Sequence, residues 1–269
     1  MSNFIYIIAE GVLDVVVIAQ VLRRGFEATI VEQKLDLPTQ AQNWLDTFKW
    51  PINDNIARRA VPAPAFVKSD TFIVGLRNAQ GLTNIKRTVN ADMEAFLRMK
   101  WQPTAMGVIL DADTEPPANR FADFATFLHA KGYPNPVNLD IVARSNGLRA
   151  GVFAFPGQGQ PGTLEDVLLP LAAARFPDLS QHAYNYVNAW FLTTFALNHT
   201  DFNELRSPSG RKKAIISSIL SLSKPAKPIA ASVEDHHWIP KTPRACATLA
   251  PLMNFLDQLL SVDETGIKT

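Results

Sequence analysis

Two carboxylates stand one residue apart at the point where a strongly apolar stretch of the chain ends. In the segment MGVILDADT, Gly107 to Leu110 carries no polar side chain, as expected of a strand that is buried on both faces of a parallel sheet. Asp111 and Asp113 follow directly, and side chains at i and i+2 of an extended chain point the same way. Because two such charges repel each other, a hard divalent ion such as Mg²⁺ between them is the simplest explanation. Alternatively, the acids form a turn and Asp113 caps the helix that begins near Pro116.

Further acids follow the first predicted strand, Phe4 to Ala9. Glu10 ends this strand, and Asp14 lies one turn into the helix predicted next, so the two carboxylates share a side. Because ligands of open parallel sheets bind outside the carboxyl ends of the strands, we expect Glu10 and Asp111 to face the same crevice. An unpaired charge inside an apolar helix is costly, which favours a shared role for Asp14. Alternatively, Asp14 is stabilised by the helix dipole and Glu10 is a cap residue.

The third acidic group, Glu165 and Asp166, follows the Gly- and Pro-rich segment FPGQGQPGT. That segment matches neither a Walker loop nor a dinucleotide-binding fingerprint, so we interpret it as a flexible loop beside the acids. Thr163 places a hydroxyl before the two acids, which is typical of a helix start. We therefore interpret Glu165 as the better candidate for a metal ligand and Asp166 as a structural acid.

The predicted elements that position these acids have the order of an α/β protein. Strands and helices alternate over residues 1–176, where residues 4–32 are predicted to open a mostly parallel sheet flanked by helices. Residues 177–269 are richer in long helices, so we predict a helical C-terminal extension packed on that sheet. Strands are predicted at 4–9, 26–32, 66–74, 107–110, 138–144 and 149–155, the last two joined by an Asn-Gly turn. Helices are predicted at 12–24, 83–101, 118–130, 179–198, 212–222 and 249–260, and from Leu164 onward.

Composition narrows the class of protein and of partner. The chain of 269 residues has 47% hydrophobic and 19% charged residues, which is typical of a soluble globular protein. Its formal net charge of +1 provides no global attraction for nucleic acid, so any site for a polyanion must be local. The single cysteine, Cys246, excludes an internal disulfide and a cysteine-based zinc site. The start MSNFIYIIAEG lacks the basic segment of a signal peptide and no apolar stretch could span a bilayer, so we expect a cytoplasmic protein without a membrane partner.

Taken in order, EG-x-x-D from Glu10, DAD from Asp111 and LED from Leu164 resemble the acidic motifs of the Toprim fold. This is the metal-binding domain of topoisomerases, primases and the overcoming-lysogenisation-defect (OLD) nucleases. The whole chain is more closely similar to a family of uncharacterised, Toprim-related bacterial proteins of about this length. In that family DAD is accompanied by a loop like FPGxxxPGxLED and by a helical tail with a Lys-Ala pair, here Lys213-Ala214. The resemblance covers most of the chain and implies a Toprim-like fold.

Residue by residue, the resemblance implies a metal site. Glu10 matches the Toprim glutamate, which serves as a metal ligand or general acid/base, and Asp111 and Asp113 match the metal-binding DxD. Asp14 matches the additional acid of the nuclease-like branch, which uses two metals, and Glu165 would complete the second site. The implied cofactor is Mg²⁺ or Mn²⁺, and the implied catalytic residues are Glu10 and Asp111.

The first hypothesis for function is therefore a metal-dependent, nuclease-like enzyme that processes a phosphodiester of DNA or RNA. The nuclease branch also uses a lysine, for which Lys212 and Lys213 are candidates beside the simpler interpretation of a solvated helix face. The ATPase that accompanies OLD nucleases would be a separate partner protein. The alternative hypothesis is a non-catalytic Toprim-like binding or regulatory module, which the near-zero net charge favours. His236 and His237 are interpreted as loop residues, because adjacent side chains point apart.

Overall fold

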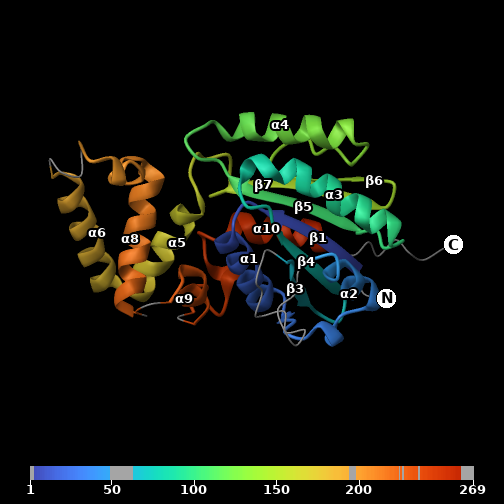
Figure 1. The fold of residues 1–269 in the computed structure, drawn as a ribbon, viewed down its shortest axis with the longest axis horizontal. Helices are drawn as coiled ribbons and strands as arrows, with labels where there is room; N and C mark the ends of the chain where they lie inside the picture. Colours follow the sequence, from blue (N-terminus) through green and yellow to red (C-terminus); the bar gives the residue numbers. More distant parts are fainter. Residues whose placement is uncertain are drawn as a thin grey trace.

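The computed structural model describes residues 3–48, 63–193, 198–223, 225, 227–235 and 237–261. Its centre is a seven-stranded sheet with the strand order β2-β3-β4-β1-β5-β7-β6 (Figure 1). The middle strands run parallel and are β4 (Phe72–Asn78), β1 (Asn3–Ala9), β5 (Ala105–Asp111) and β7 (Leu148–Phe155). The edges are antiparallel and are formed by β2 (Thr29–Ile30), β3 (Ala65–Lys68) and β6 (Val142–Ser145). The predicted α/β class with a mostly parallel sheet is confirmed.

Helices cover both faces of this sheet, because its central strands are apolar on both sides. In β1, Ile7 points to one face, Tyr6 and Ile8 point to the other, and all of them are buried. The first face is covered by α1 (Val12–Gly25) and α10 (Ala250–Leu260). The second face is covered by α2 (Thr39–Leu45), α3 (Ile85–Arg98) and α4 (Pro117–Ala130) (Figure 1). Within the described residues, no helix is long and apolar enough to cross a membrane.

The connections between the parallel strands diverge at one place in the sheet. The chain leaves β1 through α1 on the first face and continues toward β4, on one side of β1. It leaves β5 through α4 on the second face and continues toward β7, on the other side. The neighbours β1 and β5 therefore flank a topological switch point, and a crevice is expected outside their carboxyl ends.

The segment between α1 and α3 differs from the predicted arrangement. The strand predicted at 26–32 is reduced to β2, which pairs antiparallel with β3 at the edge of the sheet. The prediction that residues 4–32 open the parallel sheet is therefore wrong, since β1 lies between β4 and β5. The strand predicted at 66–74 is a hairpin of β3 and β4, because the Ser69 hydroxyl accepts the N–H groups of Thr71 and Phe72 and turns the chain. Residues 49–62, within the region predicted to be irregular, lie outside the described residues.

The elements that follow α3 agree more closely with the sequence pattern. β5 ends at Asp111, and α4 and α10 lie within a residue or so of their predicted bounds. The predicted hairpin is formed by β6 and β7, with Asn146 and Gly147 at φ values of 52° and 77°. Positive φ at both central residues is the geometry that an Asn-Gly turn favours.

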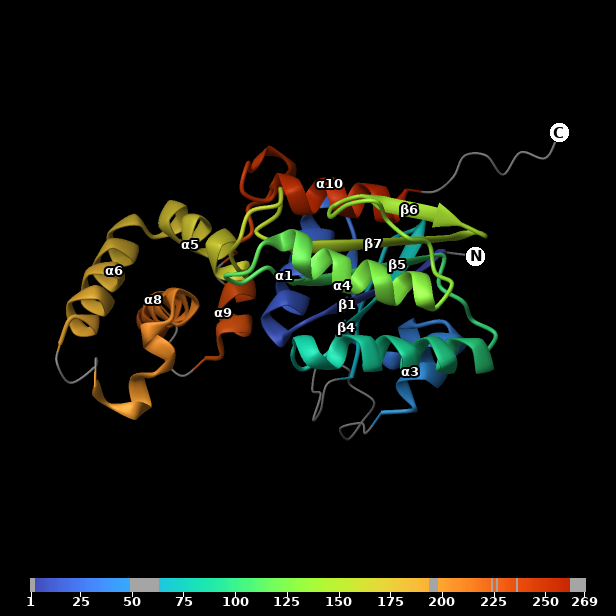
Figure 2. The same ribbon diagram turned by 90° about the horizontal axis from the view of Figure 1, so that it is seen from above.

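The predicted helical C-terminal part is divided in space. Beside the sheet, one group is formed by α5 (Leu164–Arg175), α6 (Pro177–Phe191) and α8 (Pro208–Ser223) (Figure 1). By contrast, α9 (Ile229–Asp235) packs against α1, and α10 returns to the sheet along β7 and β6 (Figure 2). Residues 194–197 of the helix predicted at 179–198 lie outside the described residues. The boundary at residue 176 stays a prediction, although packing of α5 with α6 and α8 crosses it.

Glycines in two neighbouring strands allow α10 to lie directly on the sheet. Gly107 of β5 and Gly151 of β7 are register partners. A Cβ atom at Gly151 would lie 2.7 Å from the ring of Phe255 and 3.0 Å from the Val142 side chain. At Gly107 it would lie 2.8 Å from the Leu259 side chain. The close approach of α10 therefore depends on the absence of side chains at this pair.

We expect Gly151→Val to lower the free energy of unfolding by about 1–3 kcal/mol, because a rigid ring and a neighbouring strand leave no room for a branched side chain. Thermal unfolding followed by circular dichroism measures this loss. The matched control is Ser145→Val, which introduces the same side chain at an exposed strand position. Equal unfolding temperatures for the two variants would show that α10 does not pack as described.

Candidate functional site

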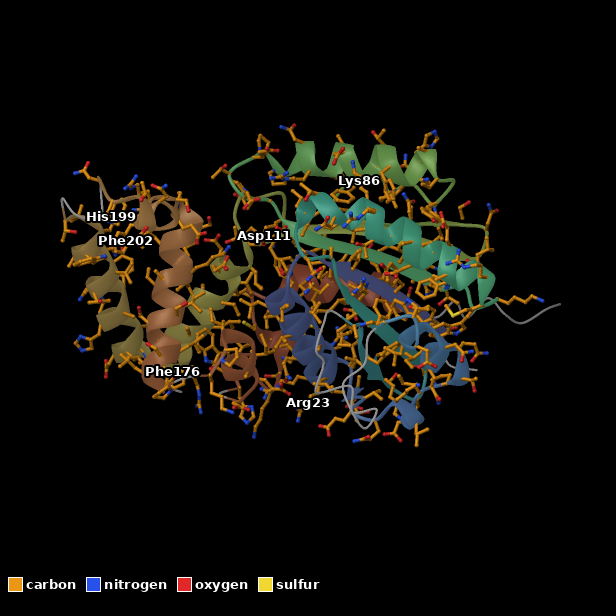
Figure 3. The ribbon with its side chains drawn as sticks, viewed as in Figure 1. Arg23, Lys86, Asp111, Phe176, His199 and Phe202 are labelled. Carbon is orange, nitrogen blue, oxygen red and sulfur yellow. The ribbon has the colours of Figure 1, made fainter. Side chains whose placement is uncertain are left out.

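Glu10 and Asp111 lie side by side at the switch point. Glu10 directly follows β1, and Asp111 is the last residue of β5, its parallel neighbour in the sheet. The backbone N–H of Asp111 donates to Glu10 Oε2 over 3.5 Å, a long hydrogen bond across the two strand ends. Figure 3 shows Asp111 at the end of the sheet that faces the helical group. The structure thus brings together the two residues that the sequence places at the carboxyl ends of different strands.

The start of α1 brings Asp14 to the same place. Gly11 is the N-cap residue, and its N–H donates to Asp14 Oδ2 over 2.8 Å. A Cβ atom on Gly11 would lie 2.9 Å from that oxygen, so a glycine lets the carboxylate approach the backbone. Asp14 Oδ1 is buried without a hydrogen-bond partner, and the residue is only 6% exposed. Asp14 therefore uses one oxygen as a helix cap and keeps the other free.

The start of α5 completes the group. Leu164 N–H donates to Asp111 Oδ1 over 2.8 Å, so the helix begins on the carboxylate that ends β5. Asp166 accepts the N–H of Thr163 over 2.9 Å, in keeping with its interpretation as a structural acid. Glu165 is 5% exposed, and its Oε2 is buried without a partner. The two neighbouring acids of α5 thus have different environments.

Burial and mutual repulsion act on these carboxyl groups. Burial, with repulsion from Asp14, raises the pKa of Asp111 to about 8, although the hydrogen bond from Leu164 opposes this change. Burial also raises the pKa of Asp14 to about 7, and the charges of Glu10 and Glu165 contribute to the increase. The N-termini of α1 and α5 favour negative charge, but here they do not outweigh burial and repulsion. The group is therefore strained when all of its members are ionised.

Charged residues around the buried group also act on Glu10. Burial raises its pKa and Asp113 raises it further, while the nearby Arg120 and Lys213 oppose the increase. Arg120 of α4 also pairs with Asp113, with Nη2 to Oδ2 at 3.2 Å. The sequence reasoning missed Arg120, because nothing in its spacing distinguishes it from other arginines on exposed helices.

Asp113 does not share the direction of Asp111. Its φ of 56° lies in the left-handed region, and its N–H donates to Gly162 O over 2.7 Å. The i, i+2 argument requires an extended chain, and the strand has already ended at Asp111. The Asp113 carboxylate pairs with Arg120, and the alternative that it caps the helix near Pro116 is wrong, because no described side chain caps the start of α4. The bond to Gly162 also places the segment FPGQGQPGT beside the acids, as predicted.

The chemistry of this group suits a hard cation, but its geometry is not that of a formed metal centre. Within the described residues, no three or more His, Cys, Asp or Glu side chains are placed to hold a metal ion. The donors that fit such an ion are the unpartnered oxygens of Asp14 and Glu165, together with Glu10 and Asp111. A divalent cation would offset the burial and the mutual repulsion that raise the pKa of Asp111 and Asp14. The arrangement thus supplies oxygen ligands at one end of the sheet that do not converge on a common point.

The two candidate lysines have different surroundings. Lys212 Nζ lies 2.5 Å from Asp166 Oδ1, an ion pair that joins α8 to the start of α5. Lys213 is exposed, and its charge acts on Glu10. His237 lies elsewhere, with Nδ1 at 2.7 Å from Arg24 Nη2, and His236 lies outside the described residues. Lys212 is therefore held by Asp166, whereas Lys213 acts on Glu10 through its charge.

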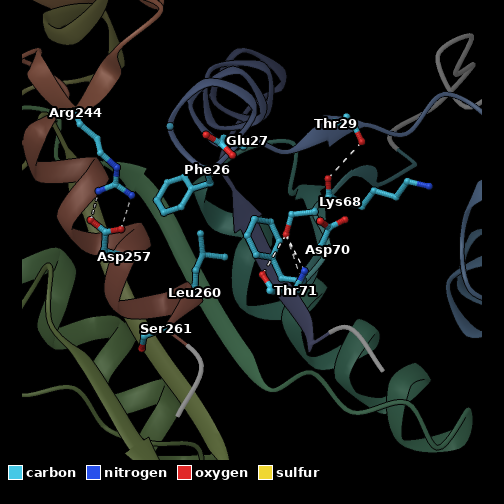
Figure 4. Close-up of a pocket in the computed structure, with 13 residues that line it drawn as sticks. Phe26, Glu27, Thr29, Lys68, Asp70, Thr71, Arg244, Asp257, Leu260 and Ser261 are labelled. Atoms are coloured by element: carbon cyan, nitrogen blue, oxygen red, sulfur yellow. Dashed lines mark hydrogen bonds and ion pairs between the residues drawn. The ribbon is translucent and has the colours of Figure 1, made fainter. Parts of the chain in front are cut away.

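A pocket of about 620 Å³ lies at the C-terminal end of α1 (Figure 4). Gly25, the last residue of α1, lines it together with Phe72, the first residue of β4. Two of its charged side chains neutralise each other, since Arg244 donates to both oxygens of Asp257 at 2.7 Å (Figure 4). None of the acids predicted from the sequence lines this pocket. The acids at the switch point remain the better candidate for chemistry.

Comparisons with known proteins support the fold and identify a family. A crystal structure of a hypothetical protein from Pyrococcus horikoshii OT3 is similar, with a TM-score of 0.54 and 14% identity over 96% of this chain and 95% of that chain. At this identity the likeness concerns the fold alone. No curated protein matches the chain. A family profile described as "Protein of unknown function (DUF3226)" matches residues 5–261. The chain therefore belongs to the DUF3226 family.

Proposed function

We propose that this protein is a Toprim-type, Mg²⁺- or Mn²⁺-dependent enzyme that cleaves a phosphodiester of DNA or RNA. The observation that carries the proposal is the clustering of Glu10, Asp14, Asp111 and Glu165 at the switch point of the sheet, where their charges act on one another. These acids come from the carboxyl ends of two parallel strands and from the first turns of two helices. Ligands of open parallel sheets bind at such a place.

The metal ligands in this proposal are Glu10, Asp14, Asp111 and Glu165, with Asp113 held at the rim by Arg120. A bound divalent ion would stabilise the charge that develops on the attacking and leaving oxygens of a phosphodiester. Glu10 is half-buried and has a raised pKa, properties that suit a general acid or base at this site. Asp111 orients the site, because its Oδ1 is fixed by the Leu164 N–H.

Two cations support a phosphate-containing substrate. Arg120 of α4 and Lys213 of α8 both act electrostatically on Glu10. Cations next to a carboxylate cluster provide partners for phosphate oxygens, which the net charge of +1 alone would not. The nucleic-acid substrate in this proposal therefore lies across the acids, between α4 and α8.

One observation favours the alternative of a non-catalytic Toprim-like binding or regulatory module. Within the described residues, the acids do not form a group that is ready to hold a metal. A partner that adjusts the start of α5 by a small distance would complete the site, and a separate ATPase is the partner that the resemblance to OLD nucleases implies. The two functions differ in what the isolated chain does with metal and nucleic acid.

We expect the isolated protein to nick DNA or cleave RNA with Mg²⁺ or Mn²⁺, and Glu10→Ala and Asp111→Ala to lose activity by about 100-fold or more, as when the ligands of a catalytic metal are removed. Labelled single- and double-stranded substrates, separated on denaturing gels, measure the rates. The control is Glu94→Gln, which removes an exposed acid on α3. An inert wild-type protein over all four substrates would favour the non-catalytic module.

The acid cluster also predicts how stability depends on pH. Unfolded aspartates lose their protons near the ordinary value of 3.8, whereas folded Asp14 and Asp111 retain theirs up to about pH 7 and 8. Between those limits the folded state binds more protons, so the metal-free protein is expected to lose stability as pH rises. Asp111→Asn removes one charge and keeps an acceptor for the Leu164 N–H.

We therefore expect Asp111→Asn to be more stable than the wild type by at least about 1 kcal/mol near roughly pH 8 in a chelator, with the difference disappearing toward roughly pH 4. Calorimetric unfolding measures both effects. Mn²⁺ is expected to raise the unfolding temperature of the wild type more than that of the variant. A variant that is less stable than the wild type at every pH would contradict the described repulsion.

The two lysines are expected to separate function from stability. Lys213→Gln should weaken nucleic-acid binding and leave the unfolding temperature unchanged, because Lys213 is exposed and its charge acts on Glu10. Lys212→Gln should lower the free energy of unfolding by about 1 kcal/mol, because it breaks the partly buried pair with Asp166. Fluorescence anisotropy and thermal unfolding measure the two effects. The reverse result would assign the functional lysine to Lys212.

A further inference from the structure

A second pocket, of about 630 Å³, lies where α1 and α5 end. Arg24 in the last turn of α1 and Arg175 at the end of α5 line it, together with residues of the segment that follows α9. The acid cluster is at the opposite ends of the same two helices. With a rise of 1.5 Å per residue, these helices separate the two places by roughly 20 Å. The pocket is therefore distinct from the candidate active site.

The charge of this pocket is of one sign. Arg24, Arg175 and Lys241 contribute guanidinium and ammonium groups, and none of the lining residues is an acid. Arg24 is partly engaged, because it donates to Ile239 O and lies 2.7 Å from His237 Nδ1. Arg175 and Lys241 are exposed and form no ion pair with the described residues. In a chain with a net charge of +1, an unneutralised cluster of cations favours an anionic ligand.

The C-terminal dipoles of α1 and α5 explain only part of this charge. Each helix end favours one or two basic residues, which accounts for Arg24 and Arg175. Lys241 lies on neither helix and is still directed to the same pocket. The three cations therefore line one pocket, although the helix dipoles do not account for Lys241.

The floor of the pocket is apolar. Leu171 and Cys246 line it, and so does Trp238, which is 2% exposed. The Trp238 Nε1–H group is buried without a hydrogen-bond partner. Because this nitrogen is not accessible from the pocket, Trp238 contributes only apolar surface to the floor. A volume of about 630 Å³ is also within the range of small-molecule sites.

We propose that this pocket binds a nucleoside monophosphate. The phosphate lies among Arg175, Lys241 and Arg24, since guanidinium groups match phosphate oxygens in charge and geometry. The base lies over the apolar floor that Leu171, Trp238 and Cys246 form. The proposal does not depend on the function proposed for the acid cluster.

The experiment is a calorimetric titration of the full chain in a chelator, which keeps divalent ions from bringing phosphates to the acids. The probes are AMP, GMP, CMP and UMP, with adenosine and inorganic phosphate as separate arms. We expect at least one nucleotide to bind about tenfold or more tightly than inorganic phosphate and than adenosine, because only the nucleotide uses both parts of the pocket. If none of the four nucleotides binds more tightly than inorganic phosphate, the proposal is overturned.

Variants locate the site. Arg175→Gln and Lys241→Gln are each expected to weaken nucleotide binding by about tenfold, because each removes a charged hydrogen bond to phosphate. Both side chains are exposed, so the variants are expected to fold as the wild type does, which circular dichroism checks. The matched control is Arg23→Gln, an exposed arginine next to Arg24 that does not line the pocket. Equal weakening by all three variants would show general attraction to the surface and would overturn the proposal.

Discussion

The repulsion among buried carboxylates at the ends of β1 and β5 is the constraint around which this site is built. Burial and repulsion raise the pKa values of Asp14 and Asp111 to about 7 and 8, so ionising these groups lowers the stability of the folded state. The surrounding structure offsets part of that cost. The N-termini of α1 and α5 lie at the cluster and favour negative charge. The backbone N–H of Gly11 donates to Asp14, and Arg120 pairs with Asp113. A charged cluster maintained in this way is typical of a functional site.

The position of the cluster follows from the topology of the sheet. β1 is central, and its neighbours β4 and β5 are reached by connections on opposite faces, which leaves a crevice outside β1 and β5. The helical group lies beside this end of the sheet (Figure 3). Asp111 fixes the start of α5, and the pair of Lys212 with Asp166 fixes α8 to the same turn. The helical group is thus part of the site, and its placement sets the distance between Glu165 and the strand ends.

Charge is separated along α1 and α5. Their first turns carry Asp14 and Glu165 beside the other acids, and their ends carry Arg24 and Arg175 in the cationic pocket. Each helix therefore has acidic residues at its positive end and basic residues at its negative end, which stabilises both helices. The net charge of +1 conceals this separation. A nearly neutral chain can present two local fields of opposite sign, and each selects a different kind of ligand.

The sequence by itself determined the features that depend on local pattern. The apolar run before Asp111 specified a buried strand, Asn146-Gly147 specified a hairpin, and the order of acids after β1 and β5 predicted that Glu10 and Asp111 would meet. These predictions succeed because alternation, turn chemistry and the edge of a parallel sheet require no knowledge of distant contacts.

Tertiary structure alone decided the rest. The edge position of β2 depends on pairing with β3, and the antiparallel direction of β3 depends on pairing with β4 beyond the turn at Ser69. Asp113 leaves the direction of Asp111 because Gly162 and Arg120, distant in sequence or on another element, hold it in a left-handed conformation. Pairing partners, ion pairs and the packing of helix ends are long-range choices with many alternatives of similar local preference, so a single sequence does not distinguish them.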